Sequence, residues 1–145
     1  MASGLNERVN QQLFLKKVPF GMAESDDFET KQSPAPECGE GEVLVESHYF
    51  GVDAALRLIV RDSDEFLFRV KPGDIVRGSA AGRVIESNNP QFTVGDHVLA
   101  SGGVQNFIVS NGEGLEKVDV TQASLGEWLG GFGVSGLTAY FAVTE

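Results

Sequence analysis

The side chains in this sequence that are best suited to metal binding are one cysteine and two histidines, Cys38, His48 and His97. Zinc prefers thiolate and imidazole ligands in a tetrahedral set. Cys38 has no second cysteine to join it, and the histidines lie far apart on separate predicted strands. We therefore predict no metal site and interpret both histidines as partly buried or surface residues.

Two glycine–aspartate turns, Gly73-Asp74 and Gly95-Asp96, are the next candidates, since glycine-rich turns can hold phosphate groups. Nothing basic or helical follows either turn at the spacing that a phosphate site requires, and both aspartates would repel an anion. Glycine permits positive φ, and aspartate bonds nearby backbone amides. We therefore predict that the turns are two corners of a β-structure that set the strand directions around residues 78–87.

The composition describes an acidic chain that can fold. Its 145 residues suffice for one domain with a sizeable core, 41% of them are apolar, and the formal net charge is −10. An acidic surface repels a polyanion, which argues against nucleic acid as a partner. The sequence has no long apolar leader and no membrane-length apolar run, and Cys38 has no disulfide partner. We expect a soluble, cytoplasmic protein without a membrane partner.

The hydrophobic pattern predicts short strands joined by sharp corners. We expect strands at 11–18, 26–32, 42–52, 81–87, 97–101, 106–110 and 115–120, loops at 33–41 and 61–65, the latter before Phe66 and Phe68, and helices at 54–60, within 121–133 and from 134 onward. In the longest strand, alternation places Val43 and Val45 on one face and Phe50 on the other.

Five segments, taken in order, carry a family resemblance. They are Glu42-Val43-Leu44-Val45, Val52-Asp53, the strand at 82–86, Val94-Gly95-Asp96-His97-Val98 and Gly136-Leu137-Thr138-Ala139-Tyr140. Their order and spacing resemble the medium-chain dehydrogenase/reductase superfamily. Within it, the chain is most similar to the zinc-independent leukotriene B4 dehydrogenase/prostaglandin reductase branch, which includes plant double-bond reductases. The resemblance covers nearly the whole chain.

The resemblance implies a mainly β fold, a GroES-like partly open β-barrel with short helices that ends in a helix leading into a Rossmann domain. We expect the barrel at residues 1–120 and a helical segment at the domain junction at 121–145. In the family, the Rossmann half carries the glycine-rich turn that holds the dinucleotide. No apolar strand followed by GxGxxG occurs in this sequence, so that half is expected to be missing here.

The same resemblance implies the reaction and its cofactor. Related enzymes use NADPH to reduce the carbon–carbon double bond of enals, enones or quinones, and negative charge develops on the substrate carbonyl oxygen. The expected oxygen donor is a tyrosine of the missing half, so we assign no catalytic residue to this chain. Arg77-Gly78-Ser79 stands where zinc-dependent relatives carry Gly-His-Glu, which predicts a reaction without zinc. In related enzymes dimerisation mostly uses the missing half, so the full-length protein can form a homodimer.

The resemblance also selects site residues, each with an ordinary structural alternative. Asp53 and Thr138 are the expected cofactor-binding residues; the alternatives are a helix N-cap for Asp53 and a bond to its own helix for Thr138. Tyr49 and Phe50 are expected at the substrate cleft, although a core aromatic is the commoner fate for either. Ala55 replaces a substrate-holding tyrosine of the branch, which predicts a roomier or differently shaped pocket.

Two further functions compete with the reductase hypothesis. GroES-like barrels also occur as non-catalytic ligand- or protein-binding modules, because a fold does not fix a function. A scaffold protein that lost its cofactor half is the other alternative. Measured NADPH oxidation by the full-length protein separates the reductase from both.

Overall fold

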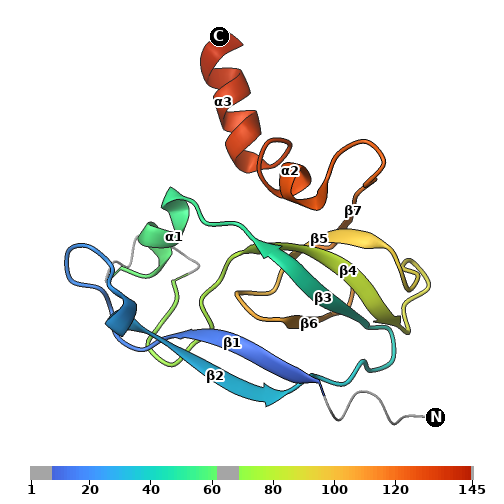
Figure 1. Cartoon of the computed structure of the whole chain (residues 1–145), viewed down its shortest axis with the longest axis horizontal. Helices are drawn as coiled ribbons and strands as arrows, with labels where there is room; N and C mark the ends of the chain where they lie inside the picture. Colours follow the sequence, from blue (N-terminus) through green and yellow to red (C-terminus); the bar gives the residue numbers. More distant parts are fainter. Residues whose placement is uncertain (1–7, 62–68, 145) are drawn as a thin grey trace.

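The computed structural model of the chain describes residues 8–61 and 69–144 (Figure 1). Of the charged loop expected at 61–65, only Arg61 lies within the described residues, and Phe66 and Phe68 lie outside them. The described elements, in chain order, are β1 (Val9–Leu15), the 3-10 helix η1 (Ser25–Asp27), β2 (Phe28–Pro34), β3 (Val43–Phe50), α1 (Ala54–Ile59), β4 (Ser79–Ser87), β5 (His97–Ser101), β6 (Phe107–Ser110), β7 (Glu116–Lys117), α2 (Leu125–Leu129) and α3 (Val134–Thr144).

The strands form two antiparallel sheets (Figure 1). β1 and β2 make a hairpin, and the larger sheet has the order β6-β3-β4-β5-β7. The hairpin joins the larger sheet through backbone bonds of Leu13, whose N–H donates to the Val104 carbonyl at 2.9 Å and whose carbonyl accepts from Val76 N–H at 2.8 Å. These bonds make the two sheets one partly open barrel, as predicted.

A buried side-chain bond fixes the other end of the hairpin. The Asn10 carboxamide accepts a hydrogen bond from Phe107 N–H at 3.0 Å and donates to Gln105 Oε1 at 3.0 Å. Asn10 is 2% exposed, and a buried amide is costly unless its hydrogen-bonding groups are satisfied. The polar residue in β1 therefore specifies how the hairpin docks.

The apolar core lies in two clusters. The first is formed by residues of the larger sheet and includes Val43, Val45, Val84, Val98 and Ile108. The second contains Leu15 at the end of β1 and Val60 at the end of α1, together with Val70 and Val76. The side chains of the first cluster come from β3, β4, β5 and β6, so burying them holds together strands that are distant in sequence.

The strict alternation that we predicted for β3 is wrong at its end. The pairing of β3 with β4 shifts between Leu44 and Val45 and again between Ser47 and Tyr49. The first shift leaves Ile85 of β4 unpaired, and the second leaves His48 of β3 unpaired. A bulge at His48 rotates the β3 side chains that follow it. Phe50 consequently packs against the same core cluster as Val43 and Val45, rather than on the opposite face.

The two glycine–aspartate turns have the conformation predicted for them. Gly73 has φ +96° and Gly95 has φ +103°. Asp74 Oδ2 accepts from Lys71 N–H at 3.0 Å, and Asp96 Oδ2 accepts from Thr93 N–H at 2.8 Å. Both are barrel corners built on the same local pattern.

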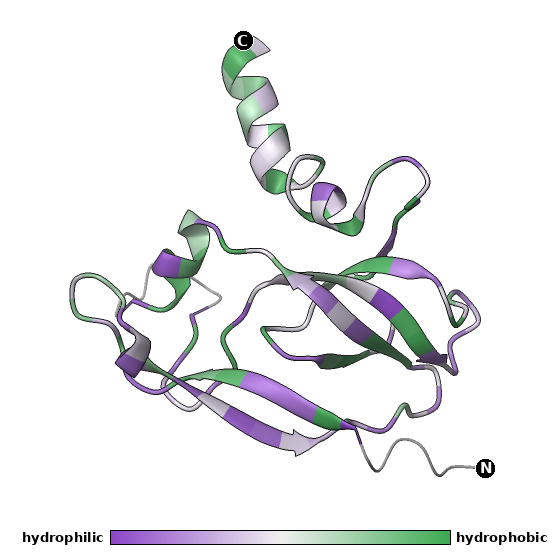
Figure 2. Cartoon of the chain, viewed as in Figure 1, coloured by the Kyte–Doolittle hydropathy of each residue, from purple (hydrophilic) through white to green (hydrophobic). Residues whose placement is uncertain are grey.

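The C-terminal part of the chain leaves the barrel (Figure 1). β7 has only two residues, where a strand over 115–120 was expected, and α2 is a short helix within the predicted range of 121–133. α3 has no buried residue, and its apolar side chains Leu137, Tyr140 and Phe141 are more than half exposed (Figure 2). None of the helices in the described residues has the length and apolar character that a bilayer crossing requires.

Candidate functional site

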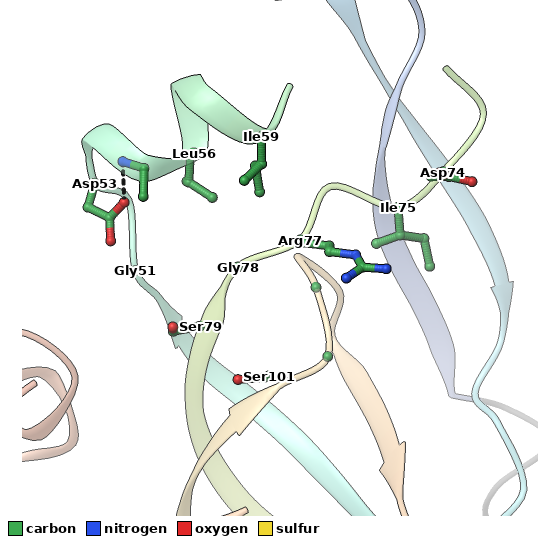
Figure 3. Close-up of a pocket in the computed structure, with 13 residues that line it drawn as sticks. Gly51, Asp53, Leu56, Ile59, Asp74, Ile75, Arg77, Gly78, Ser79 and Ser101 are labelled. Atoms are coloured by element: carbon green, nitrogen blue, oxygen red, sulfur yellow. Dashed lines mark hydrogen bonds between the residues drawn. The ribbon is translucent and has the colours of Figure 1, made fainter. Parts of the chain in front are cut away.

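Two adjoining cavities open at the end of the barrel where β3 meets α1. The first has a volume of about 770 Å³ and lies between α1 and the segments 74–79 and 101–103 (Figure 3). The second, of about 750 Å³, lies between the ends of β3 and β5, helix α2 and the start of α3. Both volumes fall in the range of small-molecule sites. The residues shared by the two cavities are Gly51, Asp53, Ala55, Ser79 and Ser101.

Gly51 lines the region that the two cavities share. A Cβ atom at this position would lie 3.7 Å from Ser79 Cβ and 3.8 Å from Leu129 Cδ1, so a larger side chain would occupy part of that region. Gly51 N–H also donates to the Ser79 carbonyl at 2.8 Å, which holds the end of β3 against the start of β4.

Asp53 is the N-cap of α1, which is the structural role that we gave as the alternative to cofactor binding. Its Oδ1 accepts from Ala55 N–H at 2.8 Å, the dashed line in Figure 3. No partner in the described part of the chain bonds its Oδ2, and the residue lines both cavities. The cap therefore fixes the carboxylate in place and leaves one oxygen available to a donor.

The two predicted substrate-cleft aromatics differ in their surroundings. Tyr49 is 52% exposed, pairs with Ala81 of β4 and lines the second cavity. Phe50 also lines this cavity but packs against the buried core of the larger sheet. Tyr49 is therefore the more available of the two, while Phe50 mainly supports the cavity floor.

Ala55 and Thr138 complete the set of predicted site residues. Ala55 lies in the first turn of α1 and lines both cavities, so its small side chain leaves their common region open. Thr138 lies in α3, and its hydroxyl donates to the Val134 carbonyl at 2.7 Å, the intrahelical bond that was its structural alternative. Leu137, its neighbour in α3, lines the second cavity.

Helix α2 covers the second cavity with Trp128 and Leu129. Ser124 and Glu127 begin the helix with a capping box, and hydrogen bonds from the Ser124 side chain and backbone hold the pKa of Glu127 below its usual value.

Trp128 Nε1–H donates to the Asp119 carbonyl at 3.0 Å, which orients the indole. Hydrogen bonds from Thr121, then Gln122, likewise lower the pKa of Asp119, so the turn before α2 is itself held by an ionised side chain.

Charged side chains line the first cavity on one side. Asp74 belongs to the first glycine–aspartate turn, where its carboxylate accepts from Lys71 N–H. Arg77 extends toward Ile75 and away from Asp53 (Figure 3). With Asp53, the charges around the cavity are mixed in sign and favour no strongly charged ligand.

Sequence reasoning missed the serines and the α2 residues of the site. Ser79 was noted only as part of the Arg77-Gly78-Ser79 segment, and Ser101 only as a strand end. Their signal is visible in hindsight, because each is a polar residue at a strand terminus: Ser79 begins β4 and Ser101 ends β5. Only the strand pairing brings the two together.

Residues 8–61 and 69–144 contain no group of three or more His, Cys, Asp and Glu side chains placed to hold a metal ion. Cys38 donates to the Glu42 carbonyl at 3.2 Å. Burial raises the pKa of its thiol, so the thiolate that zinc would need is disfavoured.

Comparison with known proteins connects this site to a family. The model of a family described as the N-terminal domain of oxidoreductase matches residues 11–118. Prostaglandin reductase 1 of Bos taurus is 38% identical over 140 residues, which cover 90% of this chain and 39% of that protein. The NADPH-dependent curcumin reductase of Escherichia coli is 29% identical over 142 residues, which cover 98% of this chain and 41% of that protein. The chain thus spans about two fifths of the length of these relatives.

Solved structures agree with the sequence relatives. CurA from Vibrio vulnificus matches with a TM-score of 0.85 and 33% identity, covering 92% of this chain and 40% of the CurA chain. CurA from the same organism in complex with NADPH matches with a TM-score of 0.84 and 29% identity, at the same coverage of both chains. The barrel and its cavities therefore belong to a GroES-like domain.

Proposed function

The chain belongs to the medium-chain dehydrogenase/reductase superfamily, in the group of the prostaglandin and curcumin reductases, and we propose that it forms the substrate-binding domain of an NADPH-dependent reductase. The proposed reaction is reduction of the carbon–carbon double bond of an enone, enal or quinone, without a metal ion. The proposed division is a GroES-like barrel at residues 1–120 and a helical junction at 121–145. We propose a cytoplasmic location and a homodimer for the whole protein.

The observation that carries this proposal is the pair of joined cavities around Asp53 and Gly51. The second cavity presents Tyr49, Leu99, Trp128 and Leu129 to a ligand. Aromatic and aliphatic walls with few polar groups suit a flat, conjugated carbonyl compound. The absence of a tyrosine ring at Ala55 leaves room for a substrate bulkier than a short enal.

The cofactor is expected to contact this chain at Asp53. The free Oδ2 of Asp53 accepts hydrogen bonds only, so it fits the amide or hydroxyl donors of a nicotinamide nucleotide. When bound, NADPH supplies the hydride for the reduction. Thr138 is the second proposed contact; because its hydroxyl proton is donated to Val134, it would act toward the cofactor as an acceptor.

The proposal is tested by measuring NADPH oxidation by the full-length protein with enals, enones, quinones and nitroalkenes. We expect turnover with at least one enone or quinone, and no change in rate after treatment with a zinc chelator. In a parallel titration, residues 1–145 alone are expected to bind no NADPH, because one side of the nicotinamide pocket cannot hold the dinucleotide. A rate that the chelator abolishes would contradict the metal-free reaction.

The alternative function is a non-catalytic ligand- or protein-binding module. It predicts that the full-length protein binds apolar carbonyl compounds in these cavities without oxidising NADPH. Complete absence of NADPH oxidation across the four compound classes, with retained ligand binding, would favour this module over the reductase.

A further inference from the structure

We propose that the hydroxyl groups of Ser79 and Ser101 form one binding site for the carbonyl oxygen of the ligand. This inference deepens the proposed function, on which its choice of ligand rests. It assigns recognition of the carbonyl group to the barrel itself.

The strand register places the two serines side by side. Ser79 of β4 and Ser101 of β5 are direct partners in the antiparallel pairing. The Cβ atoms of direct partners are about 4.5–5.5 Å apart, and their side chains lie on the same face of the sheet. A hydroxyl–oxygen hydrogen bond is about 2.7–2.8 Å long, so a single acceptor between the serines can bond both hydroxyls.

Neither serine hydroxyl is used in a hydrogen bond within the described part of the chain. Both serines are exposed, and no hydrogen bond joins either hydroxyl to a residue within 8–61 or 69–144. By contrast, the Ser87 hydroxyl, in the same strand as Ser79, donates to the Phe92 carbonyl at 2.7 Å. The two hydroxyls at the cavity end of the sheet are thus available to a ligand.

Their neighbours define the rest of the ligand. The next row on the same face consists of Tyr49, Ala81 and Leu99, which pair across β3, β4 and β5. Tyr49 and Leu99 line the second cavity together with the two serines. A polar row beside an apolar row matches a ligand whose oxygen lies at one end of an apolar, conjugated body.

The charges of the cavities favour a neutral oxygen over an anionic one. Asp53 lines both cavities, and Glu116, the partner of Leu99, lines the second. Their carboxylates disfavour a carboxylate ligand near the serines. The Arg77 side chain extends toward Ile75 and not toward Ser79 or Ser101 (Figure 3). We therefore commit to a ketone, aldehyde or quinone carbonyl as the group bound.

The test compares two ligands on the full-length protein by calorimetry. The first is an aryl enone, and the second is its hydrocarbon counterpart, in which a =CH2 group replaces the carbonyl oxygen. The variants are Ser79→Ala, Ser101→Ala and the double variant, with Ser25→Ala as the control, because Ser25 is exposed and lies outside both cavities. Thermal melting checks that each variant folds.

We expect each single alanine variant to weaken enone binding roughly three- to tenfold and the double variant more, with hydrocarbon binding changed by less than about twofold. Ser79→Thr and Ser101→Thr keep the hydroxyl and should retain the preference for the enone. In steady-state assays the KM for the enone should rise while the KM for NADPH stays unchanged.

Three results from the variants would overturn the inference. They are equal losses for both ligands, an unchanged preference for the enone in the double variant, and a KM effect confined to NADPH. A wild-type protein with no preference for the enone over the hydrocarbon would also overturn it. Failure of the proposed function gives a different result, in which the serine-dependent preference is present but NADPH is not oxidised by any unsaturated carbonyl compound.

Discussion

The two glycine–aspartate turns share one local structure and have different surroundings. In each, a glycine adopts positive φ and the aspartate accepts from a backbone N–H three residues earlier. Asp74 lines the first cavity, whereas Asp96 pairs with Lys117 Nζ at 2.7 Å. The same sequence pattern therefore builds a wall of the site in one place and a link between strands in the other.

The link made by the second turn explains how the shortest strand stays on the sheet. β7 has two residues and, among the strands that the structure describes, pairs only with β5. Lys117 of β7 bonds Asp96 and also lies 5.3 Å from the centroid of the Phe92 ring. A charged hydrogen bond and a cation–π contact thus supplement a ladder too short to hold alone.

The largest loss of stability is expected when the positive-φ glycine that both turns share is replaced. We expect Gly73→Ala and Gly95→Ala each to lower the free energy of unfolding by about 1–3 kcal/mol, because alanine is strained at positive φ. An added Cβ meets nothing within 4 Å at Gly73 and only Arg83 Nη2 at 3.7 Å at Gly95, so the two losses should be similar. Urea unfolding measures both. Gly126→Ala in α2 is the control and should not destabilise the protein; unequal losses at the turns would show that their backbones are not equivalent.

A smaller effect should separate the turns. Asp74→Ala and Asp96→Ala each remove a side-chain bond to a backbone amide, which costs about 1 kcal/mol. Asp96→Ala also removes the Lys117 pair, worth about 0.2–1 kcal/mol at a partly exposed site, so it should destabilise more. Urea unfolding at low and high salt measures the difference, which should shrink in high salt. A larger loss of stability for Asp74→Ala than for Asp96→Ala would contradict the stabilising role given to the Asp96–Lys117 pair.

The smallest expected effect is a pH dependence of stability at the second turn. Hydrogen bonding from Lys117, then from Thr93, holds the pKa of Asp96 below its usual value. A carboxyl whose folded pKa is depressed stabilises the fold above its unfolded pKa, and that contribution is lost as the pH falls through the folded value. The stability difference between wild type and Asp96→Asn should therefore be constant near neutral pH and shrink below about pH 4. Lys117→Gln should make the shrinkage smaller; a difference that grows in acid would contradict the sign.

The features that could be predicted from the sequence are those set by neighbouring residues. The turn at Gly95, the N-cap at Asp53 and the helix from Val134 each depend on a few consecutive residues, and the structure has all three. β3 was predicted less well, because the bulge at His48 depends on pairing with β4 and leaves no local signal. The side of the sheet on which Phe50 lies follows from that bulge.

The site shows the same limit. Asp53 and Ala55 could be selected because a family motif covers them, and Tyr49 because it ends the long strand near the expected cleft. All three line the cavities. Ser79 and Ser101 could not, because they lie 22 positions apart and meet only through the register of β4 and β5. A pair formed by strand register is invisible until the pairing is known.

The Asn10 bond has a consequence for how the protein is made. Asn10 and Phe107 are 97 positions apart, so at about 5–20 residues per second the ribosome completes the docking partner roughly 5–20 s after the hairpin's first strand. During that interval β1 and β2 can pair with each other, and β1 can bond Val76, but the Asn10 bonds cannot form. The outer strand β2 carries Glu29 and Lys31, which pair at 2.8 Å, and it ends at Pro34. Charged residues and proline discourage a strand edge from pairing with another chain. The outer edge of the hairpin is therefore protected while the rest of the chain is synthesised.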